Sequence, residues 1–579
     1  MRRIFNTLVC GLLLCCGAFL QEAKAAIRTV DNTTDNGALT ACGEAANDCS
    51  LRGAVTGAGN GDTINFDPSL NGSTITLDSL INIPTSLAIM GPGADKLTIS
   101  GGGTTSLFEA VVIASTTFSG LTFANGNGVG GGNGGQGGAI EVNSGALATF
   151  DSVVFRDNSA AIIGGALLCA VGTCRISNST FVNNSSPQAA VFYQPSGTLE
   201  MMNTTISGNH ETSSTYGAFY TTGNGVIRNS TIVNNTARCG MYKSGGGTLT
   251  LGNTIIAGNT GSDIFVNFGS LATNGGNLIG NNLNAGATFA SAGTPNANSD
   301  YVGTGSSQIN PQLAPLSNYG GGTPTYALLS NSPALNAGNN CVLDNSCAPA
   351  VAAALITDQR GAGAPRKIGS AVDIGAFERN ITLDQSTVPN GQVNVPYNSG
   401  VPFQLTATRQ TSFANLEDVK SSAAQSFAPT QFVIVPPDVA APFQQLPPGL
   451  SLSTGGQLSG IPTMAGTYSL FVKATDSDGA AGVQQYTMQI FSPTAASVTV
   501  SGRVLMPDGR GLRNVRVTLT DQNGYARTVI TGARGAYHFA EVAVGELDVI
   551  TVLSKSYSYA PQAVYVTGEI NELNFTASP

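Results

Sequence analysis

The sequence predicts an all-β protein, a right-handed parallel β-helix (solenoid) followed by two β-sandwich domains. Three observations predict this architecture. An apolar residue followed three positions later by asparagine returns six times, at intervals of 23 to 26 residues. Glycine makes up 73 of the 579 residues and charged residues only 10%, which is typical of short strands joined by tight turns. Beyond residue 380 the composition shifts to proline and strand-forming residues.

The N-terminus has the pattern of a secretory signal peptide, residues 1–25. Arg2 and Arg3 precede an apolar stretch, and Ala23-Lys24-Ala25 fits a cleavage site before residue 26. Cys15 and Cys16 leave open a lipidated cysteine, although neither follows a small residue. Because no later run approaches about 18 apolar residues, we expect no transmembrane segment after the signal peptide.

Seven cysteines follow the signal peptide, and six of them lie in close pairs. This spacing predicts short disulfide loops, formed in an oxidising compartment, and leaves Cys239 over. Zinc is a weaker alternative, because the chain has only two histidines. We therefore expect a secreted protein, extracellular or at the cell-envelope surface, with the pairs Cys42 and Cys49, Cys169 and Cys174, and Cys341 and Cys347.

The overall charge argues against nucleic acid as a partner. The formal net charge is −9 and the pI about 4.8. The mature chain has no basic run that could follow a phosphate backbone.

The repeated motif sets the length of one coil. A coil of about 25 residues with three short strands fits a parallel β-helix, in which equivalent residues lie above one another at about 4.8 Å. The lead residues of the motif should form one internal stack. The asparagines should tolerate left-handed turns and bond from coil to coil as a ladder. The stack is predicted to contain Phe155, Phe181, Ile206, Ile232 and Ile256.

Two sequence signatures carry a family resemblance. GGAI at 137–140 with FRDN at 155–158, and GGAL at 164–167 with FVNN at 181–184, resemble the polymorphic outer-membrane protein repeat. That resemblance implies a secreted β-helical passenger involved in adhesion. Later coils depart from it, with Ile for Phe and Ala for Gly.

Both ends of the array are similar to secreted β-helix proteins of the choice-of-anchor type. At the start, CSLRGAV at 49–55 follows Cys42 and indicates a disulfide-pinned cap. At the end, SPALNAG at 332–338, DQRG at 358–361 and DIGAFE at 373–378 match the closing segments. The β-helix is therefore expected over 26–380. Arg360, Asp373 and Glu378 are expected to form a structural ion cluster there, in preference to a catalytic one.

Two further domains are expected. LPPGLSL at 446–452, GQLSGIP at 456–462 and ATDSDG at 474–479 resemble the immunoglobulin-like and cadherin-like domains of bacterial surface proteins, over 385–493. SGRV at 501–504 and TGARGAYHF at 531–539 resemble the carboxypeptidase regulatory-like sandwich, over 497–579. Calcium is the one cofactor indicated, at Asp476 and Asp478, with an Asx turn as the favoured alternative.

The coil register also permits a search for an enzyme site. It places Glu200 over Arg175 and predicts no vertical pair of carboxylates. Weak catalytic candidates are Glu141, Asp151, Arg156 and Asp157, which share the early coils. Aromatic residues that could stack on a sugar are Tyr216, Tyr220 and Tyr242, whereas Phe219 is expected to point inward.

The sequence therefore favours a non-catalytic, adhesin-like surface protein whose β-helix face binds a polysaccharide or another cell-surface ligand. The alternative is a polysaccharide lyase or glycoside hydrolase of the β-helix type with accessory modules. A purely structural envelope spacer is a third class.

Overall fold

The structure, a computed structural model, describes residues 25–111, 115–143, 147–409, 431–436, 445–477, 480–492, 497–522, 524–545 and 547–578. The signal-peptide prediction lies almost wholly outside them. The chain is all-β, with a parallel β-solenoid of about nine turns, and so the predicted fold class is confirmed. It forms two compact units, Met1–Pro389 with Gly400–Gly460 and Thr467–Met488, and Asn390–Ser399 with Ile461–Gly466 and Gln489–Pro579.

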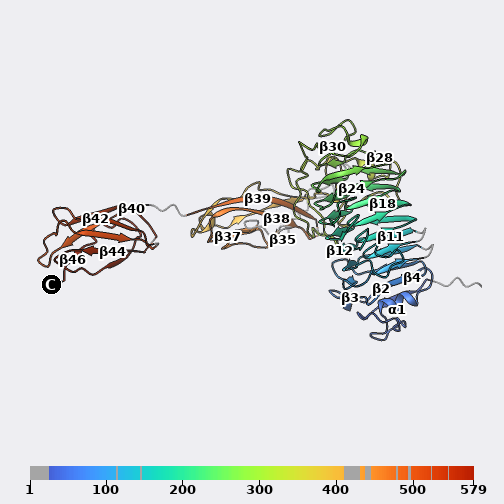
Figure 1. The fold of residues 1–579 in the computed structure, drawn as a ribbon, viewed down its shortest axis with the longest axis horizontal. Helices are drawn as coiled ribbons and strands as arrows, with labels where there is room; N and C mark the ends of the chain where they lie inside the picture. The colour runs from blue at the N-terminus through green and yellow to red at the C-terminus, as the bar shows by residue number, and fades with distance from the viewer. Residues whose placement is uncertain are drawn as a thin grey trace, which may run out of the picture. The chain divides into compact units, whose positions relative to one another are not determined.

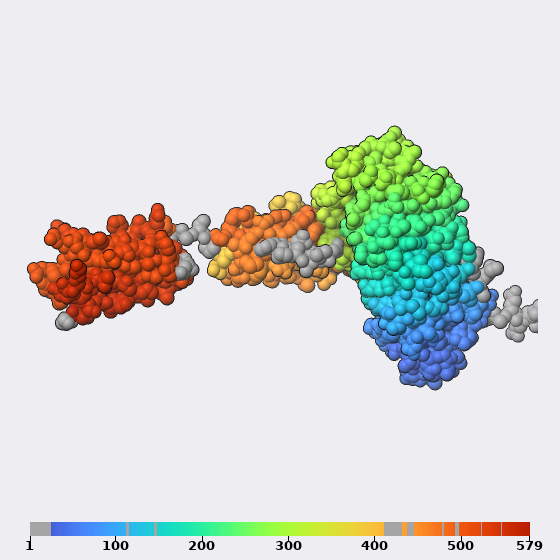
Figure 2. All heavy atoms as spheres, in the orientation of Figure 1, coloured from blue at the N-terminus to red at the C-terminus, as the bar shows by residue number. Residues whose placement is uncertain are grey.

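Three parallel sheets run along the solenoid, and successive coils follow one another from blue to green (Figures 1 and 2). The first sheet contains, in order, β1 (Ile27–Val30), β2 (Asp62–Phe66), β5 (Leu87–Met90), β8 (Thr116–Ser119), β11 (Leu147–Asp151), β14 (Thr173–Ser177), β18 (Thr198–Met202), β22 (Asn224–Arg228), β25 (Thr248–Gly252) and β28 (Ser270–Thr273). The second contains β4 (Ile81–Ile83), β7 (Phe108–Ala110), β10 (Ile140–Val142), β13 (Leu167–Cys169), β17 (Phe192–Gln194), β21 (Phe219–Thr221), β24 (Cys239–Lys243) and β27 (Ser262–Val266). The third contains β3 (Thr74–Thr76), β6 (Thr98–Ser100), β9 (Thr122–Ala124), β12 (Val154–Arg156), β15 (Thr180–Val182), β19 (Thr205–Ser207), β23 (Thr231–Val233), β26 (Ile255–Ala257), β29 (Leu278–Ile279) and β30 (Tyr301–Val302).

The core is a set of apolar columns, one residue per coil. In the third sheet the predicted stack is confirmed, because the lead residues pair in register and are fully buried. The rings of Phe155 and Phe181 are parallel, with centroids 4.7 Å apart. Phe192 and Phe219 stack in the same way in the second sheet, at 5.0 Å, which confirms the inward orientation of Phe219. Each coil thus buries aromatic or branched side chains against the next.

The predicted asparagine ladder is also present, on the fourth residue of each motif. The side-chain Nδ2 of each asparagine donates to the side-chain Oδ1 of the asparagine in the next coil, at 2.8–3.0 Å. The same oxygen accepts the backbone N–H one coil earlier, so buried turn groups are satisfied without water. The left-handed backbone falls on the preceding residue of the motif. The ladder consists of Asn158, Asn184, Asn209, Asn235 and Asn259.

The two glycines of each GGA signature have different roles. Gly137 and Gly164 adopt positive φ, 57° and 72°, which most side chains resist. Gly138 allows close approach, because a Cβ there would come within 1.9 Å of the Gly165 carbonyl oxygen. In the next coil Ala189 takes the left-handed position at φ 47°, so the drift from Gly to Ala carries some backbone strain.

The N-terminal end carries the expected cap. Cys42 is joined to Cys49, and α1 (Leu51–Thr56) follows with Ser50 as its N-cap, accepting from Gly53 N at 3.0 Å. Two more disulfides join Cys169 to Cys174 and Cys341 to Cys347, and Cys239 is buried as a free thiol. Short elements complete this part, namely β16 (Ser185–Ser186), β20 (His210–Glu211), η1 (Pro68–Leu70), η2 (Ala287–Phe289) and η3 (Asn340–Val342).

The remaining strands form small sheets, most of them antiparallel. Between residues 381 and 491 these are β31 (Ile381–Leu383) with β34 (Ala407–Arg409); β32 (Gly391–Gln392), β39 (Ala481–Phe491), β38 (Gly466–Thr475) and β35 (Gln431–Val435); and β33 (Phe403–Gln404), β37 (Gln457–Gly460) and β36 (Leu450–Leu452), with η4 (Tyr397–Gly400) between strands. The last residues form β43 (Ala536–Ala543), β40 (Ser497–Leu505) and β46 (Phe575–Thr576) against β42 (Ala526–Ile530), β41 (Arg516–Thr520), β44 (Leu547–Leu553) and β45 (Gln562–Tyr565). A separate core of valine, leucine and aromatic side chains lies in this last sandwich.

Candidate functional site

The outer face of the second sheet carries a graded column of side chains. One residue of each strand pairs in register with the next strand and lies beside the inward core residues. The column begins with polar and acidic residues and changes to aromatic ones. In coil order it consists of Asn82, Glu109, Glu141, Leu168, Tyr193, Tyr220, Tyr242 and Phe265.

The aromatic part of this column, together with Tyr216, is here called the tyrosine strip. Ring centroids along the column are 5.1 Å apart from Tyr193 to Tyr220, 5.1 Å from Tyr220 to Tyr242 and 5.2 Å from Tyr242 to Phe265. Tyr216 stacks on Tyr220 at 4.5 Å from the side. Contact with their neighbours holds these rings in place. Tyr193, Tyr216, Tyr220 and Phe265 are partly exposed, whereas Tyr242 is buried between its neighbours.

A cation lies over the far end of the tyrosine strip. The Arg238 guanidinium is 4.0 Å from the ring centroid of Phe265 and 5.7 Å from that of Tyr242. Its Nη1 also donates to the Thr215 carbonyl oxygen at 2.9 Å. These contacts fix the guanidinium above the aromatic residues.

A groove of about 350 Å³ lies beside the near end of the strip. Its polar lining consists of uncharged amides and phenol hydroxyls. Burial raises the pKa of Tyr220 to about 12, helped by the neighbouring tyrosines, so its hydroxyl stays protonated at neutral pH and can donate. The lining residues are Asn133, Gln136, Ile162, Ile163, Leu168, Ala170, Gln188, Tyr193, Pro195, Tyr216 and Tyr220.

The prediction that no vertical carboxylate pair exists was wrong. Glu109 in β7 lies directly against Glu141 in β10, and both are buried. The coil between them is lengthened by the glycine-rich segment 125–137, so a count of about 25 residues does not reach Glu109. The Asn143 amide nitrogen bridges the two, at 2.6 Å from Glu109 Oε1 and 3.2 Å from Glu141 Oε2. Burial raises the pKa of Glu141, opposed by its hydrogen bonds and reinforced by the charge of Glu109.

The other catalytic candidates lie on different faces. Asp151 is on the first sheet, where its Oδ1 accepts from Ser177 Oγ at 2.7 Å and Asn178 Nδ2 at 2.8 Å. Arg156 and Asp157 form a partly exposed ion pair of 2.8 Å at the third sheet. The structure therefore brings only these last two candidates together. Among the described residues, no group of three or more His, Cys, Asp or Glu side chains could hold a metal ion.

Of the two predicted calcium ligands, the structure describes Asp476. Asp476 Oδ2 pairs with Arg409 at 2.9 Å, and its Oδ1 accepts from Ala480 N at 2.9 Å. Both oxygens thus have protein donors. Asp478 lies outside the described residues, so the paired calcium site stays a prediction.

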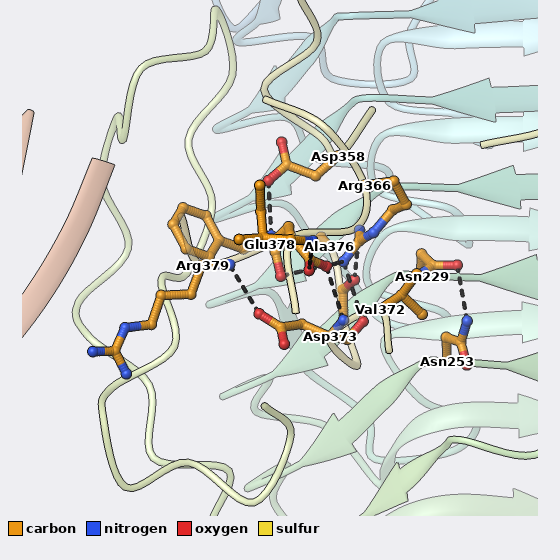
Figure 3. Close-up of polar contacts among 12 residues, drawn as sticks. Asn229, Asn253, Asp358, Arg366, Val372, Asp373, Ala376, Glu378 and Arg379 are labelled. Carbon is orange, nitrogen blue, oxygen red and sulfur yellow. Dashed lines mark hydrogen bonds and ion pairs between the residues drawn. The ribbon is translucent and has the colours of Figure 1, made fainter. Parts of the chain in front are cut away.

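The closing segment forms a buried ionic cluster (Figure 3). Arg360 pairs with Asp358 at 2.7 Å and Arg366 with Glu378 at 3.2 Å, and these four side chains are at most 1% exposed. Asp373 accepts backbone N–H groups of Asn336 and Arg379, whose own side chain points away. Burial and the charge of Asp373 raise the pKa of Glu378. The cluster has no open face for a substrate among the described residues, so its arrangement suits a structural role.

Sequence reasoning missed Glu109, Tyr193 and Phe265, which the strand register places in the column. Counting residues from the repeated motif also sets Lys243 at the position that Tyr242 occupies. Phe219 pairs with Met241 inside, which sets Tyr220 against Tyr242 outside. An alignment anchored on the inward residues would have found the strip.

Comparisons with known proteins identify the two C-terminal domains. Residues 384–491 match the family model described as "Putative Ig domain", and residues 499–578 match "Carboxypeptidase regulatory-like domain". These results confirm the two resemblances seen in the sequence. No curated protein matches the chain.

Solved structures give only distant likenesses. The Bacillus anthracis TIE protein is 12% identical over 34% of this chain and 40% of its own, with a TM-score of 0.19. BcpA, the major pilin subunit of Bacillus cereus, is 11% identical over 36% of this chain and 74% of its own, at 0.15. A C-terminal fragment of the pilus adhesin SpaC from Lactobacillus rhamnosus GG is 13% identical over 31% and 75%, at 0.14. TM-scores this low carry no argument about function.

Proposed function

We propose that the protein is a secreted or cell-surface binding protein that holds a hydroxyl-rich, uncharged glycan on the tyrosine strip of its β-helix. The observation that carries the proposal is the strip beside an amide-lined groove. The partly exposed rings offer apolar surface to sugar C–H groups, and the amides and phenols offer donors and acceptors to hydroxyls.

Other features support the location. The three disulfides are typical of an oxidising compartment. The described residues include no helix of the length and apolarity that crossing a membrane requires. The immunoglobulin-type and carboxypeptidase regulatory-like domains fit a modular surface protein, in agreement with the resemblance of the repeats to secreted passengers.

The test is glycan binding by the full chain, first on an array of neutral and acidic oligosaccharides and then by calorimetry. We expect Tyr220→Ala to weaken binding of the selected glycan at least about tenfold, equivalent to about 1.4 kcal/mol. The matched control is Tyr525→Ala, because Tyr525 is 67% exposed and lies far from the strip in sequence. Full affinity in Tyr220→Ala, or an equal loss in the control, would overturn the proposal.

A polysaccharide lyase or hydrolase is the second candidate, favoured by the Glu109 and Glu141 pair next to the groove. Against it, Glu141 is fully buried under the glycine-rich segment. A depolymerisation screen separates the two functions. Turnover that Glu141→Gln abolishes would establish the enzyme, and binding without turnover would support the binding protein.

A further inference from the structure

Glu109 and Glu141 are like charges held face to face in the interior. They are direct register partners in adjacent parallel strands, and their exposed fractions are 8% and 0%. Like charges directly opposite each other destabilise a sheet, and burial strengthens the repulsion. The donors that reach them from the described residues are the neutral N–H groups of Gly132, Asn133 and Asn143. Within the described part of the chain, no arginine or lysine pairs with either carboxylate.

One oxygen of this pair has no partner. Glu141 Oε2 accepts from Asn133 N, Asn133 Nδ2 and Asn143 Nδ2, at 3.1–3.2 Å. Glu141 Oε1 is buried and has no hydrogen-bond partner among the described residues. Protonation would remove the charge but would leave an O–H at Oε1 without an acceptor among the described residues. The unpaired Oε1 is therefore open to a donor or a cation.

The glycine-rich segment lies directly over the same oxygens. A Cβ on Gly131 would come within 1.8 Å of Glu141 Oε1, and one on Gly132 within 2.6 Å of Glu109 Oε1. Only glycine therefore lets the backbone cover both carboxylates. Asn133 from this segment also contacts Asn143 and lines the groove.

We propose that Glu109 and Glu141 bind a calcium ion beneath Gly131 and Gly132, with the side-chain amide oxygens of Asn133 and Asn143 as further ligands. All available ligand atoms are oxygens, which suits a hard cation, and two carboxylates balance a charge of +2. Calcium fits better than magnesium, which keeps several waters and demands a rigid octahedron. Both amides present their nitrogen to the carboxylates here, and turning over both directs the two Oδ1 atoms toward the glutamates while keeping the bond between Asn133 and Asn143. The ion then fixes the segment that forms the end of the groove.

The test is calcium binding by the full chain, stripped of metal with a chelator, followed by calorimetry and thermal unfolding. We expect one ion at this site and a rise in Tm with calcium. Glu109→Gln and Glu141→Gln should each weaken binding at least about tenfold. Without calcium both variants should unfold no lower than the wild type, because each removes the repulsion while keeping the side-chain shape.

Two controls make the result specific. Glu200→Gln changes a carboxylate paired with Arg175 on another sheet and should keep full calcium affinity. Asp476→Asn tests the alternative location. Absence of calcium binding in the wild type, or binding that survives both glutamate variants, would overturn the proposal. Because no glycan is present, the result is independent of the proposed binding function.

Discussion

The carboxylate of Asp263 ends the asparagine ladder, accepting from the Asn259 side-chain amide and backbone N–H at 3.1 Å each. Every earlier step of the ladder ends on another asparagine. Burial raises the pKa of Asp263 to about 6, against its hydrogen bonds from Asn259. Asp263 therefore places an ionisable carboxylate at the position that a neutral asparagine amide occupies in the earlier coils.

We expect Asp263→Asn to stabilise the protein at neutral pH. The folded state binds more protons than the unfolded state between pH about 4 and about 6, so the contribution of Asp263 is present at low pH and lost as pH rises through 6. The loss amounts to about 3 kcal/mol. Urea unfolding from pH 4 to 7 should show this decline in the wild type and a flatter profile in the variant. An unchanged slope would contradict this account.

Asn209→Ala should destabilise the β-helix by about 3 kcal/mol or more, because buried groups lose partners on both sides. The Asn184 backbone and side-chain N–H groups lose their acceptor, and the Phe181 carbonyl oxygen loses a donor. The unfolding midpoint in urea measures this. The control is Thr236→Ala, an exposed position, which should change the midpoint little.

Arg366→Met should cost about 3–5 kcal/mol, because it leaves Glu378 buried without its ion pair. Arg366 also donates to the Gly375 and Asp373 carbonyl oxygens, so the double variant Arg366→Met with Glu378→Met should recover only part of the loss. A double-mutant cycle in urea gives the coupling. Arg510→Met is the control, since its pair with Asp508 is exposed. Equal effects of the two single variants would contradict a structural role for the closing cluster.

Lys243→Met should change how stability depends on alkaline pH. Burial lowers the pKa of Lys243 to about 8, and its Nζ donates to the neutral carbonyl oxygens of Thr222 and Ser244. Between pH 8 and about 10.5 the unfolded state binds more protons, so this group makes the wild type more stable as pH rises. The variant should lack that rise in Tm. A parallel pH profile in both proteins would show that Lys243 titrates normally.

Much of the β-helix could be predicted from the period of the repeated motif. The repeated motif placed Phe155 against Phe181 and Glu200 over Arg175, where the structure has an ion pair of 2.7 Å. It also predicted the asparagine ladder. These predictions succeed because one interior column per strand fixes the register of every other residue on that strand.

The candidate site was harder to predict, because its position depends on departures from the period. The glycine-rich segment lengthens one coil and brings Glu109 to Glu141, and a shorter coil moves Tyr242 into the column in place of Lys243. Extra or missing residues lie in the turns, whereas packing of the inward residues keeps the strands in register. The spacing of the motif alone does not show which turn is longer or shorter.

The tyrosine strip gains one ring per coil, so its length is set by the number of coils that carry an aromatic residue. Four rings in the column, at steps of 5.1 to 5.2 Å, give a fixed-pitch track along the solenoid axis. Duplication or loss of a single coil would lengthen or shorten this track by one step and leave the chemistry of each step unchanged. Preference for long or short ligand chains can thus evolve through coil number, without redesign of any contact.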